Sequence, residues 1–200
     1  EGVYVLKPRF GGSSIGVEIV NDGITARKLV KNSDLYSQGA VIEKYLENST
    51  DLLVGVRNFP DFDISEIEKP LKNETLFSYN DKYLENGGLE GSKRELPAKL
   101  SEQIEKKLTD MVQKINHIIP TRGIYRYDFL LHENKLYVNE INTIPGSHAL
   151  YLWKNLDNSK FELLDSMIDE ALSKQFNNWS LTGSDGIALK SAKDIASKLG

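Results

Sequence analysis

Short runs of β-branched and other apolar residues in the first third of the chain predict strands. Residues 3–6 and 15–20 are two such runs, and they flank the glycine-rich segment KPRFGGSSIG, a pattern typical of a hairpin with a long tip. Residues 40–45 and 52–57 predict two further strands. Between the second and third strands, residues 24–37 predict a short helix followed by a polar turn. This third of the chain should therefore be mainly β-structure.

Apolar residues at helical spacing predict a long helix in the middle of the chain. Ser101 is suited to cap its start, and Pro120 ends it. The apolar positions of this helix, which are expected to lie in the core, are Ile104, Leu108, Met111, Val112, Ile115 and Ile119. A hairpin follows, with strands at residues 125–131 and 135–141 joined by the polar turn 132–134.

The C-terminal quarter predicts two more helices with a polar stretch between them. Residues 161–176 form an amphipathic pattern. The residues through which this helix is expected to pack are Leu164, Ile168 and Leu172. Residues 177–186 are typical of a linker, and residues 187–199 of a short, weakly amphipathic helix.

Composition narrows the classes of function. The formal net charge of −4, with no strongly basic segment, argues against broad binding to nucleic acid or to an anionic membrane. The chain has no cysteine, which excludes disulfide and thiolate chemistry, and its histidines lack the usual zinc-ligand spacing. No apolar run reaches the roughly 20 residues that a membrane span needs, and no secretory signal is recognisable. A chain that starts in a predicted strand without an initiator methionine suggests a piece of a longer protein.

Polar residues at the ends of the predicted hairpin strands are the first candidates for chemistry. Asp128 lies on one strand and Glu140 and Asn142 on the other, although strands disfavour these residue types. Because strand side chains alternate, Leu136 and Val138 are expected on the same face as Glu140. A turn with an odd number of residues would place Asp128 opposite Glu140, and two facing carboxylates need a cation between them. Mg²⁺ prefers such ligands together with phosphate; the alternative is a solvated sheet face.

Two segments of the first half are candidates for nucleotide binding. Lys7 ends a predicted strand, and the GGSS segment after it offers N–H groups and hydroxyls to phosphate, although it is not a Walker A loop and has a plain turn as its alternative. Glu43 and the backbone near Leu46 are placed to bind an adenine ring. Lys82 is a further phosphate candidate, with an ordinary surface lysine as its alternative. The charged, glycine-rich segment 85–94 predicts a mobile loop suited to act as a lid.

Six segments, taken in order, carry a resemblance to a known family: KPRFGGSSIGV, VIEKYL, YNDKYL, ELPAKL, GIYRYDF and YVNEINTIPGS. They resemble the ATP-grasp superfamily, and specifically the D-alanine–D-alanine ligases. The likeness covers residues 3–175, and NEINTIPG with the upstream R-x-D is its most specific part. It implies an α+β ATP-grasp fold of antiparallel and mixed sheets with flanking helices, in which a nucleotide is held between two sheets. The family's N-terminal domain would be missing.

The same resemblance implies a division of the chain into three parts. Residues 1–42 would be the remainder of the central ATP-grasp subdomain, with its glycine-rich phosphate loop. Residues 43–176 would be the C-terminal ATP-grasp subdomain with the metal site. Residues 177–200 would be a linker and a tail helix of unknown role.

As a member of this family, the chain would use ATP and Mg²⁺, with Mn²⁺ as an alternative metal, to phosphorylate the carboxylate of one D-alanine. The amine of a second D-alanine would then attack. The implied nucleotide ligands for phosphates, adenine and ribose are Lys7, Lys82, Glu43, Leu46 and Asp51. The implied metal ligands are Asp128, Glu140 and Asn142. The implied catalytic residues, which stabilise the acyl phosphate and oxyanion or position substrate, are Arg126, Gly146, Ser13 and Tyr83.

The resemblance further implies a place in the cell. A ligase of this kind would serve peptidoglycan precursor synthesis in a bacterial cytoplasm and would release the dipeptide, ADP and phosphate. Its partners would be two molecules of D-alanine, with no nucleic acid and no membrane. A homodimer of the full-length protein is compatible with this reading.

Departures from the family pattern leave the substrate open. Asp51 stands where the family often has a ribose-binding Glu, after a one-residue insertion. Tyr151 stands where many members carry a Ser that binds the carboxylate of the second substrate; a phenol still donates a hydrogen bond but shapes the pocket differently. One alternative is therefore a ligase for another carboxylate and amine. The other, favoured by the missing N-terminal domain, is a nucleotide-binding module without catalysis.

Overall fold

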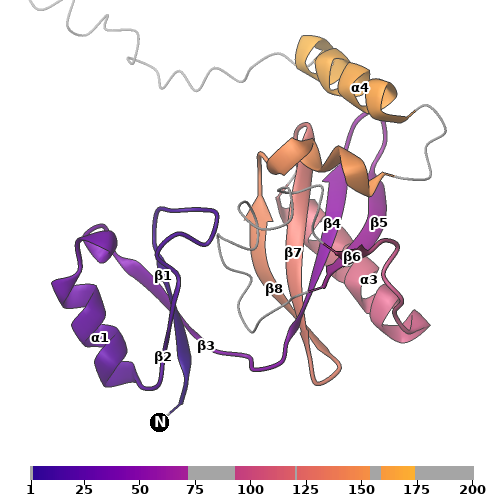
Figure 1. Ribbon diagram of the computed structural model, residues 1–200. Helices are drawn as coiled ribbons and strands as arrows, with labels where there is room; N and C mark the ends of the chain where they lie inside the picture. The colour runs from indigo at the N-terminus through magenta and orange to yellow at the C-terminus, as the bar shows by residue number, and fades with distance from the viewer. Residues whose placement is uncertain (1, 72–92, 120, 154–158, 174–200) are drawn as a thin grey trace, which may run out of the picture.

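The computed structural model describes residues 2–71, 93–119, 121–153 and 159–173 of the chain. Within them the strands form two antiparallel sheets, one in the order β2-β1-β3 and one in the order β6-β5-β4-β7-β8. Figure 1 shows the smaller sheet beside the larger one, with helix α1 (Gly23–Asn32) on its outer side. The expected α+β class with antiparallel sheets is confirmed.

The first three predicted strands make up the smaller sheet. β1 (Tyr4–Pro8) pairs with β2 (Glu18–Val20) on one side and with β3 (Ala40–Lys44) on the other. Because β3 continues to Lys44, the predicted boundary between residues 42 and 43 falls inside a strand. The two sheets are instead joined by the stretch 45–49, which follows β3 and precedes β4.

The predicted helix after β2 is α1. Its N-cap Asp22 accepts hydrogen bonds from the backbone N–H groups of Ile24 and Thr25, both at 2.8 Å, which satisfies donors that a helix start leaves without intrahelical partners. The predicted polar turn contains a short 3-10 helix, η1 (Asp34–Tyr36). The buried residues that hold α1 and η1 on the smaller sheet are Leu6, Val20, Ala26 and Tyr36.

Gly16, in the glycine-rich tip between β1 and β2, has a left-handed backbone with φ of +73°. A Cβ atom there would lie 2.8 Å from Cγ of Pro8. We expect Gly16→Ala to lower the free energy of unfolding by about 2 kcal/mol, from backbone strain and this contact together. Urea denaturation measures the loss. Gly12→Ala is the matched control, because a Cβ there meets no atom within 4 Å; equal losses in the two variants would contradict the argument.

The larger sheet contains two strands that the sequence analysis did not predict, β5 (Asp63–Pro70) and the two-residue β6 (Arg94–Glu95). β4 (Thr50–Arg57) lies between β5 (Asp63–Pro70) and β7 (Ile124–His132), while β6 (Arg94–Glu95) and β8 (Lys135–Asn142) form the edges. β5 escaped prediction because half of its residues are charged: Asp63, Glu66, Glu68 and Lys69. Its hydrophobic positions do not alternate regularly, because the pairing of β4 with β5 shifts register between Val54 and Val56.

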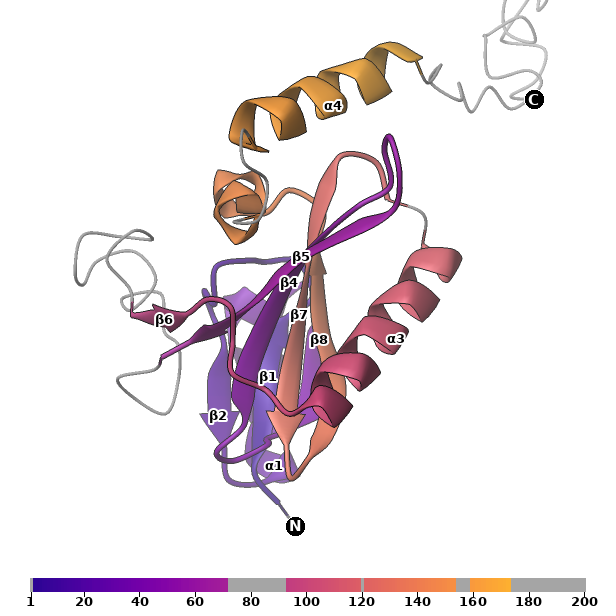
Figure 2. The same cartoon turned by 90° about the vertical axis from the view of Figure 1, so that its right-hand side faces the viewer.

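The predicted long helix is α3 (Glu102–Ile118), which lies across one face of the larger sheet in Figure 2. Leu108 and Val112 are fully buried against the sheet. The sheet residues of this core are Leu52, Val54, Val56, Tyr127 and Phe129. Two details differ from expectation: Ile119 is 44% exposed, and Ser101 occupies the N-cap position without a side-chain capping bond.

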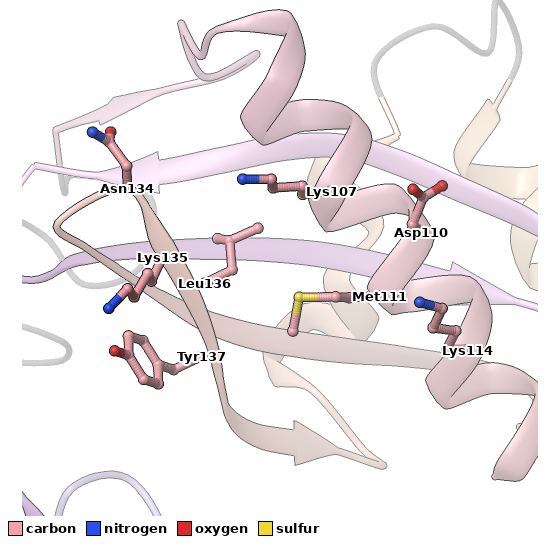
Figure 3. Close-up of a pocket in the computed structure, with 8 residues that line it drawn as sticks. All are labelled: Lys107, Asp110, Met111, Lys114, Asn134, Lys135, Leu136 and Tyr137. Carbon is pink, nitrogen blue, oxygen red and sulfur yellow. The ribbon is translucent and has the colours of Figure 1, made fainter.

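A hollow of about 430 Å³ lies where α3 approaches the β7–β8 hairpin (Figure 3). Met111 from the helix and Leu136 from the strand line its apolar part, and Lys107 and Lys114 extend from the helix beside them. Leu136 also packs against the main core. These lysines therefore lie on the helix-covered side of the sheet.

After β8 the chain forms the 3-10 segment η3 (Gly146–Leu152) and helix α4 (Ser159–Ser173), both at the same end of the larger sheet in Figures 1 and 2. The prediction that α4 packs through Leu164, Ile168 and Leu172 is wrong, because these side chains are 37%, 57% and 81% exposed.

The helix instead buries a face that contains a charge. Leu163 is fully buried against Leu152 and Trp153, and Met167 packs beside it. Glu170 completes this face at helical spacing, and its carboxylate accepts a hydrogen bond from the backbone N–H of Gly123 at 2.6 Å. The sequence analysis chose the neighbouring apolar stripe as the buried face, because a charged residue such as Glu170 is expected on the solvent side of a helix.

Candidate active site

The face of the larger sheet opposite α3 carries polar side chains in rows. On this face Leu53 of β4 pairs with Glu68 of β5 and with Asp128 of β7, and Asp128 pairs with Glu140 of β8. Paired residues of antiparallel strands point to the same side, so these four side chains form one row across the sheet. The neighbouring row consists of Gly55, Arg126 and Asn142.

Asp128 faces Glu140 as predicted, but for a different reason. The hairpin turn has two residues, Glu133 and Asn134, whose φ values of 49° and 61° are typical of a type I′ turn. Such a turn alone would place Asp128 opposite Asn139. A bulge, with Asn139 as the extra residue on β8, moves the pairing on to Glu140.

The bulge also reverses the alternation of side chains along β8. Leu136 and Val138, before the bulge, pair with Leu131 and Phe129 on the core side. The prediction that they share the face of Glu140 is therefore wrong. The bulge adds Asn139 to the polar face, where it lines the same cavity as Glu140.

A cavity of about 700 Å³ lies between the two sheets. The side chains and backbone that line it come from the glycine-rich tip, β1, β3, the connection 45–49, the polar face of the larger sheet and η3. The predicted site residues that line it are Lys7, Ser13, Glu43, Leu46, Asp51, Arg126, Asp128, Glu140, Asn142, Gly146 and Tyr151. Lys82, Tyr83 and most of the predicted loop 85–94 lie outside the described residues.

Lys7 connects the two sheets across this cavity. Its ammonium group forms an ion pair with Glu43 on the neighbouring strand β3. It also donates a hydrogen bond to Oδ1 of Asn139, the bulge residue of β8, at 2.9 Å. Two predicted nucleotide ligands, Lys7 and Glu43, are thus bound to each other, and an incoming anion at Lys7 would compete with a carboxylate and an amide.

Leu46 and Asp51 lie at the end of the cavity where the chain crosses between the sheets. The Leu46 carbonyl accepts a hydrogen bond from the backbone N–H of Ser49 at 3.2 Å, which closes a turn in this crossing. Asp51 is the second residue of β4 and lines the cavity from the larger sheet. Their positions are compatible with the adenine and ribose contacts that the family resemblance implies.

Arg126 and Asp128 form a forked ion pair at the centre of the polar face. Nε of Arg126 donates to Oδ1 of Asp128 at 2.7 Å, and a terminal nitrogen donates to Oδ2 at 2.8 Å. Burial nevertheless raises the pKa of Asp128 to about 6, with Glu140 adding to the increase and Arg126 opposing it. Burial alone would lower the pKa of Arg126, but its hydrogen bonds to Asp128 and the charge of that carboxylate raise it.

Asn142 bridges the two carboxylates that face each other. Its Nδ2 donates to Oδ2 of Asp128 and to Oε1 of Glu140, both at 3.2 Å. Rotation of the amide by half a turn would present Oδ1 at this place instead, giving three oxygen donors. Among the described residues no group of three or more His, Cys, Asp or Glu is arranged to hold a metal. Two carboxylates and an amide fit Mg²⁺, which usually takes one or two carboxylates and completes its shell with phosphate and water.

Tyr151 lies at the other end of the polar face, beside two residues that the sequence analysis did not select. Glu68 is only 4% exposed, and its carboxylate lies 3.5 Å from a terminal nitrogen of Arg94. The Arg94 guanidinium lies 5.0 Å from the centre of the Tyr151 ring. All three line the cavity. No local pattern predicts this group, because its members come from β5, β6 and η3.

The chain matches a family model described as "D-ala D-ala ligase C-terminus" over residues 3–169. A D-alanine–D-alanine ligase of Thermosipho africanus is 32% identical over 168 residues, which cover 84% of this chain and 45% of that protein. The chain thus spans about half the length of this curated relative. None of the described helices is long and apolar enough to cross a membrane.

Solved structures agree with the sequence comparison. The D-alanine–D-alanine ligase of Helicobacter pylori is 27% identical with a TM-score of 0.60, over 83% of this chain and 46% of that one. The Bacillus anthracis ligase, solved as a complex with ATP, shows the same fold at 19% identity, with a TM-score of 0.62 over 86% of this chain and 53% of that one. Together with the family model, these matches show that the chain belongs to the D-alanine–D-alanine ligase family, of which it represents the C-terminal part.

Proposed function

We propose that this chain binds Mg-ATP between its two sheets and forms the nucleotide and metal half of an ATP-dependent ligase that joins two D-alanines. The observation that carries the proposal is the arrangement of Asp128, Glu140 and Asn142 beside Arg126, on the opposite wall of one cavity from Lys7. Carboxylates for a metal and cations for phosphates thus face the same space. The family match supports D-alanine as the substrate.

The reaction would proceed in two transfers. A carboxylate oxygen of the first D-alanine takes the terminal phosphoryl group of ATP, and ADP leaves. The amine nitrogen of the second D-alanine then bonds to the acyl carbon while the carbon–oxygen bond to phosphate breaks, and the amine loses a proton to solvent. Neither step needs a nucleophilic side chain, so catalysis depends on position and charge.

The residues of this chain would act by holding charges in place. Asp128, Glu140 and Asn142 would hold the metal, which supplies neutralisation of the phosphate oxygens when bound. Arg126 would be fixed by its two bonds to Asp128 and would present its remaining N–H groups to the transferring group. Gly146, at the start of η3, would add a backbone N–H to the developing oxyanion.

The remaining proposed roles concern the nucleotide and the lid. Lys7 would leave Asn139 for an ATP phosphate, Glu43 and Leu46 would contact adenine, and Asp51 would contact ribose. Ser13 from the glycine-rich tip would help to position substrate. Lys82 and Tyr83 would complete the phosphate site and the lid, as the family resemblance implies. We further propose a cytoplasmic location and a homodimer for the full-length protein, on the same resemblance.

Lys7→Met should raise the KM for ATP by about tenfold or more, since a charged hydrogen bond to phosphate is lost. The cost in stability should be small, because Glu43 is 42% exposed at its side chain and water replaces the lost partner. Steady-state kinetics of the full-length protein at varied ATP give the KM. Lys114→Met, on α3 beside the hollow of Figure 3, removes a lysine outside the cavity and should leave the KM unchanged. If the KM for ATP is equal in both variants, Lys7 does not bind an ATP phosphate.

Release of ADP by the full-length protein across a panel of amino acids tests the proposed substrate. D-alanine should give the fastest release and a D-alanyl dipeptide as product. Equal or faster release of ADP with a different amino acid would show that D-alanine is not the preferred substrate. Tyr151, which stands where many members have a serine, is the observation that favours such a substitute.

Calorimetry of this chain with Mg-ATP tests the alternative of a nucleotide-binding module without catalysis. That alternative requires micromolar binding by the chain alone together with no ligase activity in the full-length protein. The proposed function instead requires that the full-length protein form the dipeptide, with Asp128 and Glu140 needed for turnover.

A further inference from the structure

Glu68 is a buried carboxylate that the proposed roles do not use. It belongs to the same row as Asp128, but Leu53 lies between them. Since neighbouring strands are about 4.8 Å apart, Glu68 lies roughly 10 Å from Asp128 and roughly 14 Å from Glu140 along the row. A charge this well buried needs a partner or a ligand. Its surroundings therefore indicate what this end of the cavity is built for.

Arg94 and Tyr151 both lie beside Glu68. Arg94 on β6 pairs in register with Pro70 of β5, which brings its guanidinium to 3.5 Å from the Glu68 carboxylate. The same guanidinium lies over the Tyr151 ring. Arg94 is thus held from two sides, by a buried anion and by an aromatic face, in an orientation that still borders the cavity.

The phenol of Tyr151 has one proton to donate, and the buried Glu68 carboxylate is an anion beside it. Burial raises the pKa of Tyr151 most, and the charge of Glu68 and a side-chain hydrogen bond to it raise the pKa further, so the phenol stays protonated. A phenol that turns its one proton towards Glu68 cannot give the same proton to a substrate carboxylate. The donation that a serine provides at this place in many family members would then need another residue here.

We propose that Arg94 binds the carboxylate of the amine-donating amino acid, and that Glu68 and Tyr151 are the residues that position it. This inference rests on the proposed ligase function. An amino acid that enters as the amine donor brings a carboxylate that needs a cation. Three other cations among the described residues line the cavity. Lys7 contacts Glu43 and Asn139, and Arg126 holds Asp128 with two hydrogen bonds. Lys44 comes from β3 of the smaller sheet, whereas Arg94 lies beside Tyr151 on the larger one.

Arg94 has the capacity for both contacts. A guanidinium carries five N–H donors, so it can keep Glu68 and bind a second carboxylate in the plane of its fork. Tyr151 is near both Arg126 and Arg94, whose charges each lower its pKa. A donor whose carboxylate lies on Arg94 would thus be bound near Arg126, where the proposed acyl phosphate forms. Without Arg94, the charge of Glu68 would repel the carboxylate of the amine donor. The effect of Glu68 on donor binding therefore depends on Arg94.

A competition between two amine donors tests Arg94. The full-length protein receives ATP, D-alanine and D-alaninamide, which lacks the carboxylate, and mass spectrometry gives the ratio of the two dipeptide products. The unchanged protein should prefer D-alanine strongly as amine donor. Arg94→Met should reduce this preference by about tenfold or more, the loss expected for a charged hydrogen bond. An unchanged preference in Arg94→Met would overturn the proposal, as would a loss of preference that follows Tyr151→Phe instead.

Two further variants separate positioning from general damage. Glu68→Gln should reduce the preference less than Arg94→Met does, and the double variant should lose no more than Arg94→Met alone, because Glu68 acts through Arg94. Additive losses would contradict this. Lys107→Met, a lysine at the hollow of Figure 3 outside the cavity, should keep the full preference.

Hydroxylamine distinguishes failure of this inference from failure of the proposed function. It attacks an acyl phosphate without needing a carboxylate site, so D-alanine and ATP should yield D-alanine hydroxamate in both the unchanged protein and Arg94→Met. Absence of hydroxamate with the unchanged protein would refute the ligase function, and the inference with it. Hydroxamate in both, combined with an unchanged donor preference, would refute the role of Arg94 alone.

Discussion

Asp128→Asn should lower the turnover of the full-length enzyme by about a thousandfold, the size of effect seen when one group that stabilises a developing charge is removed. Two functions are lost together. The metal loses one of its two carboxylates, and Arg126 loses the anion that fixes both of its hydrogen bonds at 2.7 and 2.8 Å. Asparagine keeps one acceptor oxygen, so one of these bonds can persist, but the fork cannot. Rates of ADP release at saturating substrates measure the effect.

The fold should survive this substitution. Without a metal, the charge of Asp128 is compensated by Arg126, so relief of its repulsion with Glu140 is not the main effect. Loss of the ion pair destabilises the folded state, while removal of a carboxylate whose pKa burial raises to about 6 stabilises it. We expect the two to offset to within about 2 kcal/mol.

Asp63→Asn is the matched control for Asp128→Asn. Asp63 on β5 also accepts from an arginine, Arg57, at 3.1 Å, but it lies outside the cavity. It should change turnover less than about threefold, because its contact lies far from the proposed chemistry. Loss of circular-dichroism signal in Asp128→Asn, or comparable turnover losses in both variants, would contradict the proposed metal role.

The hairpin illustrates how far a single sequence leads. Its strands, its polar ends and the facing of Asp128 and Glu140 were all predicted. The bulge was not, because one extra residue leaves no mark on hydrophobic periodicity except the adjacent polar pair Asn139 and Glu140. The missed bulge matters for the contact between the sheets, since Asn139 of the larger sheet accepts a hydrogen bond from Lys7.

Contacts between residues far apart in the sequence were missed. Lys7 and Asn139 are 132 residues apart, and no alternation pattern relates them. Glu68 lies in a strand that its own charges concealed, and its contact to Arg94 depends on the pairing of β5 with β6. The motif resemblance selected residues that line the cavity between the two sheets. Glu68 and Arg94 lie outside the quoted segments, and the pairing of the strands brings them to the same cavity.

Arg126→Lys should reduce turnover by about a hundredfold while the unfolding free energy changes little. A lysine keeps the positive charge that Asp128 needs, but its single nitrogen cannot occupy both positions of the fork and also point N–H groups at the transferring phosphoryl group. The loss should appear in kcat more than in the KM for ATP, because Lys7 and the metal ligands remain.

Arg57→Lys applies the same change at a comparable site and isolates the effect of position. Arg57 donates to Asp63 and lies 5.3 Å from the Trp153 ring, outside the cavity, so its replacement should likewise change the unfolding free energy little and should leave turnover nearly unchanged. Equal losses of kcat in Arg126→Lys and Arg57→Lys would show that Arg126 affects turnover only by supporting the folded structure. If Arg126→Lys instead raised the KM for ATP and left kcat unchanged, the fork would serve to bind the ground-state nucleotide, and the rate would have to come from the metal carboxylates and the Gly146 backbone.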